Sequence, residues 1–137
     1  LALIGPPMRA ATVAAWSGRA VISTLAAFGG GRETVENLRK LRAAGATVLY
    51  GTDLGNTRSP GIDAEELGLL LEAGLDGQAI VAAMTAAPRA YWEIDGVGAL
   101  TVGGPASFVI VDRDPLAEPL ALAEPGAVFV AGVSAGI

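Results

Sequence analysis

Residues 46–53 read Ala-Thr-Val-Leu-Tyr-Gly-Thr-Asp, and their pattern indicates the class of fold. Its first five residues form a short apolar run, which is typical of a buried strand. The run ends in Gly51, Thr52 and Asp53, which places a carboxylate directly after the predicted strand. Both (β/α)8 barrels and open α/β sheets carry their functional groups at the carboxyl ends of such strands. The stretch therefore indicates an α/β fold with Asp53 at its functional edge.

The residues before this strand predict a helix and another strand. Across Glu33 to Ala44, the apolar residues Val35, Leu38 and Leu41 recur on one helical face. Acidic residues in the first turn and basic residues in the last complement the helix dipole. Upstream of this helix, Ala20 to Leu25 is predicted as a second buried strand. A short helix is expected over Met8 to Ser17.

Two further helices are predicted downstream of Asp53. Asp63, with Glu66 three residues later, resembles a capping box that begins one of them. The apolar face of this helix is predicted to consist of Leu67, Leu70 and Leu71. Asp76 is predicted to cap the next helix, which should end near Pro88.

The last third of the chain has a different pattern, with short β candidates between Gly and Pro turns. Strands are predicted at Gly98 to Val102, Ser107 to Asp112 and Ala127 to Ala131. Strands that alternate with helices imply parallel βαβ units, whereas the tail implies a separate small sheet. We therefore expect two units, residues 1–95 and residues 96–137.

Composition limits the possible functions. The chain has 137 residues, 52% of them hydrophobic and 17% charged, as expected of a folded domain with a core. Its net charge of −5 argues against nucleic acid as a partner. No apolar stretch is long enough to span a membrane, and residues 1–7 make a poor signal peptide, so we expect a cytoplasmic protein. The chain contains no histidine, so any histidine used in catalysis must come from outside it.

Asp53 and the loop after it hold the candidate site residues. A carboxylate in this position can bind a divalent metal or accept a proton from a water bound to it. It can equally form an Asx-turn or cap the loop, and position alone does not decide between these roles. Asn56 and Arg58 lie in the loop after Asp53, where they can line a pocket, and they are the candidate substrate-binding residues. Arg58 can bind a substrate carboxylate.

Several segments resemble the amidohydrolase superfamily, in particular metal-dependent hydrolases of the imidazolonepropionase-like kind. The resemblance begins with Asn37 to Gly45 and Thr47 to Asp53, which look like the helix 7 and strand 8 passage of that family. Later segments that resemble it are Gly61–Leu67, Glu72–Leu75, Met84–Pro88, Gly98–Gly103, Ala106–Leu116 and Val128–Gly132. Relatives often have His where this chain has Asp63, and Asp where it has Ser107.

The resemblance implies the last βα units of a (β/α)8 barrel followed by the C-terminal strands of a small β domain. It implies hydrolysis of a C–N bond, in a cyclic amide or a related small molecule, by water activated on a divalent metal, with zinc expected. Asp53 is the matching metal ligand or proton shuttle. The other ligands of the family have no counterpart here and would lie upstream of Leu1, so we expect the chain alone to be inactive. Its expected partner is the missing N-terminal barrel portion or another copy of itself.

Two other interpretations remain open at this stage. One is a non-catalytic fragment or interaction module, which the lack of histidine favours. The other interprets residues 51–57 as a phosphate loop similar to that of actin-like ATPases and sugar kinases. That loop should continue into a strand, whereas Pro60, Gly61 and a predicted helix follow here.

Overall fold

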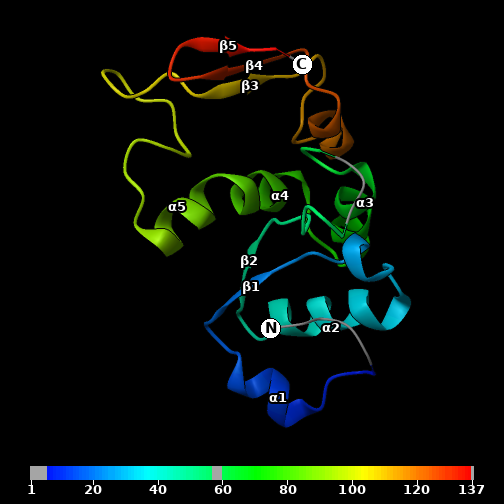
Figure 1. Cartoon of the computed structure of the whole chain (residues 1–137). Coiled ribbons are helices and arrows are strands. Elements are labelled where there is room, and N and C mark those ends of the chain that lie inside the picture. Colours follow the sequence, from blue (N-terminus) through cyan, green and yellow to red (C-terminus); the bar gives the residue numbers. More distant parts are fainter. Residues whose placement is uncertain (1–5, 57–59, 137) are drawn as a thin grey trace.

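The computed structural model describes residues 6–56 and 60–136, which form a mixed α/β fold (Figure 1). In its first part, the elements are α1 (Ala10–Ala15), β1 (Ala20–Ile22), the 3-10 helix η1 (Ala26–Phe28), α2 (Arg32–Ala43) and β2 (Thr47–Leu49). Three helices follow, namely α3 (Ala64–Glu72), α4 (Gly77–Met84) and α5 (Ala86–Trp92). The last part contains β3 (Phe108–Ile110), the 3-10 helix η2 (Pro119–Ala123), β4 (Ala127–Val130) and β5 (Val133–Ala135).

Strands β1 and β2 pair in parallel and are joined through α2, which confirms the predicted βαβ unit. Ala20 lies opposite Thr47, and Ile22 lies opposite Leu49. Just beyond the paired residues, a Cβ atom at Gly51 would lie only 2.5 Å from Cγ2 of Ile22. The backbone therefore needs glycine at this position for the two strand ends to approach each other. Within the described residues, these two parallel strands do not close a barrel.

The core lies where α2, α3 and α4 pack around the parallel strands. Its fully buried leucines and isoleucine are Leu25, Leu38, Leu41, Leu67, Leu70 and Ile80. The predicted apolar face of α3 is wrong at one position, because Leu71 is 37% exposed while Leu69 is 9% exposed. Positions 66, 69, 70 and 73 follow the i, i+3, i+4, i+7 spacing of one helical face, and Leu71 lies beside that face.

The helix that was predicted to stop near Pro88 instead breaks at Thr85 and continues. Asp76 caps α4 as predicted, since its side chain accepts a hydrogen bond from the Ala79 N–H. Thr85 has non-helical backbone angles, and α5 begins at the next residue. Pro88 then lies in the first turn of α5, where its missing N–H costs nothing because first-turn N–H groups have no partner within a helix.

The C-terminal strands form an antiparallel sheet in the order β3-β4-β5. The predicted strands at Ser107 to Asp112 and Ala127 to Ala131 are present in shorter form. The strand predicted at Gly98 to Val102 is wrong, since these residues form bends and turns. Gly96, Gly98 and Gly103 all have positive φ angles, which a strand does not allow.

Strand β5 was not predicted. It pairs with β4 through a two-residue hairpin at Ala131 and Gly132, whose φ angles are 50° and 82°. Such a turn usually contains Asn-Gly or Asp-Gly, and alanine in its first position gives no hairpin signal. Here the Ala131 N–H donates to the Ser107 hydroxyl at 3.0 Å, which helps to hold the turn.

The segment between β3 and β4 returns to the helices, because η2 packs against α3 and α4. Ala121 is buried in this contact. A Cβ atom at Gly77 would overlap the Leu116 backbone, so α4 and residue 116 also lie in close contact.

The proposed division at residues 95 and 96 stays a prediction. The phosphate-loop interpretation required a strand after residues 51–57. The next element that the structure describes after Asn56 is instead the helix α3. In residues 6–56 and 60–136, we find no helix with the length and apolar character needed to cross a membrane.

Candidate active site at the carboxyl ends of the parallel strands

The chain segments that leave β1 and β2 are joined by hydrogen bonds just beyond the strands. The Ser23 N–H donates to the Leu49 carbonyl at 2.9 Å, and the Thr24 N–H donates to the Gly51 carbonyl at 3.2 Å. In the reverse direction, the Gly51 N–H donates to the Ser23 hydroxyl at 3.3 Å. The two strand ends therefore form one connected edge, which positions the residues that follow Gly51.

Backbone strain accumulates at this edge. Thr24 and Asp53 have φ angles of 45° and 52°, and they are two of the four non-glycine residues with positive φ in the described part of the chain. A positive φ is especially unfavourable for a β-branched residue such as threonine. Each such residue costs about 1–3 kcal/mol and persists only where the surrounding structure holds it in place. Strain of this kind is typical of functional sites.

Asp53 and Asn56, two of the predicted site residues, lie together in one exposed turn. The Asn56 side-chain amide donates to Oδ2 of Asp53 at 2.8 Å, and the Asn56 N–H donates to the Asp53 carbonyl at 2.9 Å. Asn56 therefore orients the Asp53 carboxylate, which faces solvent at the carboxyl end of β2. Arg58, the third predicted site residue, lies outside the described residues. The roles of Asp53 in metal binding and of Asn56 in substrate binding stay predictions.

Asp53 can supply one ligand to a metal ion. Its carboxylate is an oxygen donor suited to a divalent cation, and its exposure leaves it accessible. The sequence has no histidine or cysteine, and among the described residues no three acidic side chains are grouped as a metal site. Among the described residues, Asp53 can therefore supply one ligand, and a site with three protein ligands would need the others from outside this chain.

Glu66 lies behind this edge, in the first turn of α3, and its side chain is fully buried. Its Oε2 accepts a hydrogen bond from the Ala26 N–H at 2.7 Å, and the Ser23 hydroxyl also interacts with the carboxyl group. Oε1 has no hydrogen-bond partner within the described residues. Burial raises the pKa of Glu66 above its ordinary value, although its hydrogen bonds act in the opposite direction.

The predicted capping box is only half correct. Asp63 caps α3, because its Oδ1 accepts hydrogen bonds from the N–H groups of Glu65 at 2.8 Å and Glu66 at 3.4 Å. Glu66 does not return the bond, since it points to Ala26, and the Asp63 N–H donates to the Tyr50 hydroxyl at 2.7 Å instead. The sequence carried a signal for this outcome. Glu66, Leu70 and Ala73 have the i, i+4 and i+7 spacing of one helical face, so the sequence places the Glu66 carboxylate on the buried face of the helix.

The buried Glu66 predicts a pH dependence of stability. Because the folded-state pKa is raised, Glu66 contributes most to stability below the ordinary glutamate pKa, and this contribution is lost as pH rises through the folded-state pKa. We expect the free energy of unfolding of Glu66→Gln, measured in urea, to fall less than that of the wild type over this rise in pH. Glu65→Gln removes the same charge from an exposed neighbour and is the matched control. Parallel wild-type and Glu66→Gln curves would contradict the prediction.

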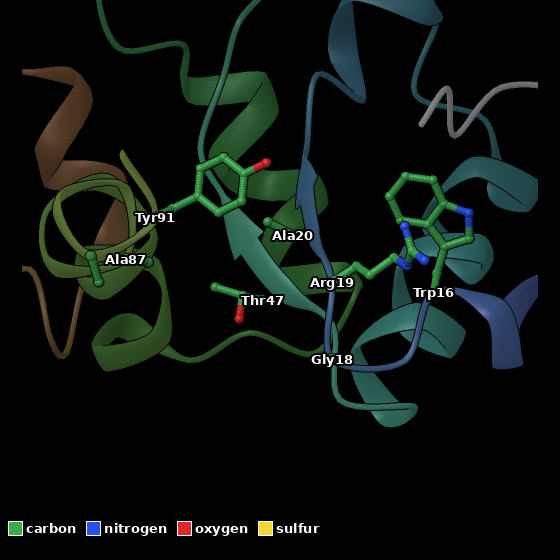
Figure 2. Close-up of a pocket in the computed structure, with 8 residues that line it drawn as sticks. Trp16, Gly18, Arg19, Ala20, Thr47, Ala87 and Tyr91 are labelled. Atoms are coloured by element: carbon green, nitrogen blue, oxygen red, sulfur yellow. The ribbon is translucent and has the colours of Figure 1, made fainter. Parts of the chain in front are cut away.

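A cavity of about 470 Å³ lies at the opposite ends of the two strands (Figure 2). Its lining includes Ala20 and Thr47, the first residues of β1 and β2, with Trp16 and Tyr91 on opposite sides. The Arg19 guanidinium lies 5.8 Å from the centre of the Trp16 ring. Because Asp53 follows the carboxyl end of β2, this cavity is not part of the candidate active site.

Comparisons with known proteins found a family match and a similar solved structure. The sequence model of the amidohydrolase family matches residues 18–136. A crystal structure of an amidohydrolase superposes with a TM-score of 0.63 at 19% sequence identity, over 85% of this chain and 34% of the other. The chain thus spans about a third of the length of that structure. No curated protein matches the sequence significantly. The family match covers most of the sequence, and the chain belongs to the amidohydrolase family.

Proposed function

We propose that the chain is the C-terminal part of a metal-dependent hydrolase that cleaves a C–N bond in a cyclic amide or a related small molecule. Residues 1–95 would supply the last βα units of a (β/α)8 barrel, and residues 96–137 the C-terminal strands of a small β domain. The family match, the parallel β1-α2-β2 unit and the antiparallel C-terminal sheet support this proposal. The likeness to imidazolonepropionase-like enzymes rests on the sequence motifs.

The observation that carries the proposal is the placement of Asp53. Its carboxylate follows a parallel strand at the carboxyl end, on a strained backbone, and Asn56 fixes its orientation. (β/α)8 barrels carry their active sites at this end. The strand end that precedes Asp53 is also hydrogen-bonded to the end of the neighbouring parallel strand.

Asp53 would act as a ligand or as a proton acceptor. A divalent metal, for which zinc is our proposal, supplies Lewis-acid activation of water when bound. Asp53 would hold its carboxylate toward this centre and take the proton that water releases, then return it to the leaving nitrogen. Asn56 keeps one carboxylate oxygen in place through its 2.8 Å hydrogen bond. Arg58 and Asn56 are the proposed contacts to substrate.

The rest of the active site would come from residues outside this chain. Catalytic zinc sites usually have three protein ligands, and Asp53 provides one. The matching structure is about three times longer than the part this chain covers. We therefore propose that the remaining barrel strands come from further polypeptide or from a second chain, and that these 137 residues alone are inactive.

The proposal is tested on the complete polypeptide that contains these residues. It should hydrolyse members of a panel of cyclic amides, lose this activity after removal of metal with a chelator, and regain it when zinc is added. A polypeptide that keeps full activity with no measurable bound metal would contradict the proposed chemistry. The isolated 137 residues, assayed beside it, should show no turnover.

A further inference from the structure

Glu66 is a buried carboxyl group that the proposed chemistry does not use. It is fully buried, and no lysine or arginine forms an ion pair with it in the described part of the chain. Burial of a carboxyl group without a cation is unfavourable unless hydrogen bonds compensate. An apolar residue would suit the same face of α3, beside Leu70 and Ala73. The contacts that Glu66 makes therefore need an explanation other than core packing.

These contacts lead from α3 to the segment that carries Asp53. Oε2 of Glu66 accepts the Ala26 N–H at 2.7 Å, which holds the chain just after β1. The Ser23 hydroxyl interacts with the same carboxyl group and accepts the Gly51 N–H at 3.3 Å. Gly51 is two residues before Asp53. The segment from Ser23 to Ala26 therefore lies between Glu66, which accepts the Ala26 N–H, and Gly51, whose carbonyl accepts the Thr24 N–H at 3.2 Å.

A second contact from the same turn of α3 reaches the end of β2. The Asp63 N–H donates to the Tyr50 hydroxyl at 2.7 Å, and Tyr50 directly precedes Gly51. The lone pairs of the Tyr50 hydroxyl oxygen accept this bond, and burial raises the pKa of the hydroxyl above its ordinary value. The first turn of α3 therefore holds the ends of both parallel strands, through Glu66 on one and Asp63 on the other.

We propose that Glu66 is a positioning residue that holds the backbone carrying Asp53 in place, through Ala26 and Ser23 in the segment after β1. The proposal rests on the function proposed for Asp53 above. Glu66 does not touch substrate or metal, and its effect passes through the Ser23 hydroxyl and the Gly51 backbone. Groups that hydrogen-bond directly to a metal ligand are worth about 10–100-fold in activity or metal affinity. Glu66 acts through an intervening segment, so we expect an effect at the lower end of this range.

The first test replaces Glu66 in the complete, metal-loaded enzyme. Glu66→Met keeps a side chain of similar length but removes the acceptor, and we expect kcat per folded molecule to fall about 10-fold, with KM nearly unchanged. Glu66→Gln keeps an oxygen that can accept the Ala26 N–H, and it should recover most of this loss. Glu65→Gln, on the exposed neighbour, should leave kcat at the wild-type value. Folded Glu66→Met with wild-type kcat would overturn the proposal.

The second test asks whether Glu66 acts through Ser23. Ser23→Ala alone should lower kcat at unchanged KM, and the combined Ser23→Ala and Glu66→Met variant should lose less than the product of the two separate losses. Fully multiplicative losses would overturn the proposed route. If Glu66→Met does not fold, Ser23→Ala decides the question, because wild-type kcat in that variant contradicts the connection to Asp53.

The outcomes distinguish this inference from the proposed function. If Asp53→Asn keeps wild-type activity, the function proposed for Asp53 fails, whatever Glu66 does. If Asp53→Asn loses activity while folded Glu66→Met and Ser23→Ala do not, only the positioning role of Glu66 fails.

Discussion

Replacement of Asp53 with asparagine in the complete enzyme is expected to lower kcat about 10²–10⁴-fold, the range for loss of a general acid–base group. Asparagine has nearly the same shape but cannot accept a proton at neutral pH, and it is a poorer ligand for a divalent metal. Its side-chain oxygen can still accept the hydrogen bond from Asn56, so the turn at residues 53–56 should persist. The measurement is steady-state turnover with metal supplied in excess, together with circular dichroism to confirm the fold.

Asp95→Asn is the matched control for this variant. Asp95 is an exposed aspartate that follows α5, the helix whose Ala87 and Tyr91 line the cavity at the opposite ends of β1 and β2. The same chemical change at Asp95 should leave kcat unchanged. Near-normal turnover in Asp53→Asn, or an equal loss in both variants, would remove Asp53 from the proposed active site.

The largest expected effect on stability is at Leu70. Its side chain is fully buried in the core between α2, α3 and α4, and truncation leaves a cavity that its neighbours can only partly fill. Leu70→Ala is therefore expected to lower the free energy of unfolding by about 2–5 kcal/mol. The measurement is urea unfolding of the complete protein followed by circular dichroism.

Leu71→Ala provides the comparison within the same helix. The Leu71 side chain is 37% exposed, and its removal should cost about 1 kcal/mol or less. Equal losses at the two positions would mean that the packing of α3 differs from that described. Both variants retain every hydrogen bond at the strand ends, so kcat per folded molecule should remain that of the wild type.

The elements that could be predicted from the sequence are those with strong local signals. Helix α2 combines a periodic apolar face with charges that match its dipole, and its bounds were predicted within one residue. Strand β2 is a short apolar run that ends in glycine, and the parallel pairing followed from the alternation of strands and helices. Local pattern and tertiary packing agree in these elements.

Other features depend on contacts between distant residues, which the local sequence does not contain. Strand β5 forms because Ala131 accepts a positive φ angle, with its N–H bound to the hydroxyl of Ser107. Glu66 follows the spacing of a capping box, yet its carboxyl group turns to Ala26, 40 residues earlier in the chain. The strained backbone at Thr24 is likewise imposed by the pairing of the strand ends.

The candidate site was predictable only in part. The position of Asp53 after an apolar strand made it a candidate, and its role stays a prediction. The structure places Asn56 within hydrogen-bond distance of it. The supporting residues Ser23 and Glu66 were not predicted as part of the site, because they reach it through buried contacts. The sequence signal for a residue such as Glu66 is a single carboxylate among the leucines of one helical face.

The most direct test is a crystal structure of the complete polypeptide with zinc bound, with the ion located by anomalous scattering at the zinc edge. The proposal predicts an oxygen of Asp53 at about 2.0–2.2 Å from the ion, or within hydrogen-bond distance of a water bound to it. A zinc ion that binds elsewhere, with the Asp53 carboxylate in contact with neither the ion nor its water, would contradict the assignment of Asp53 to the metal centre.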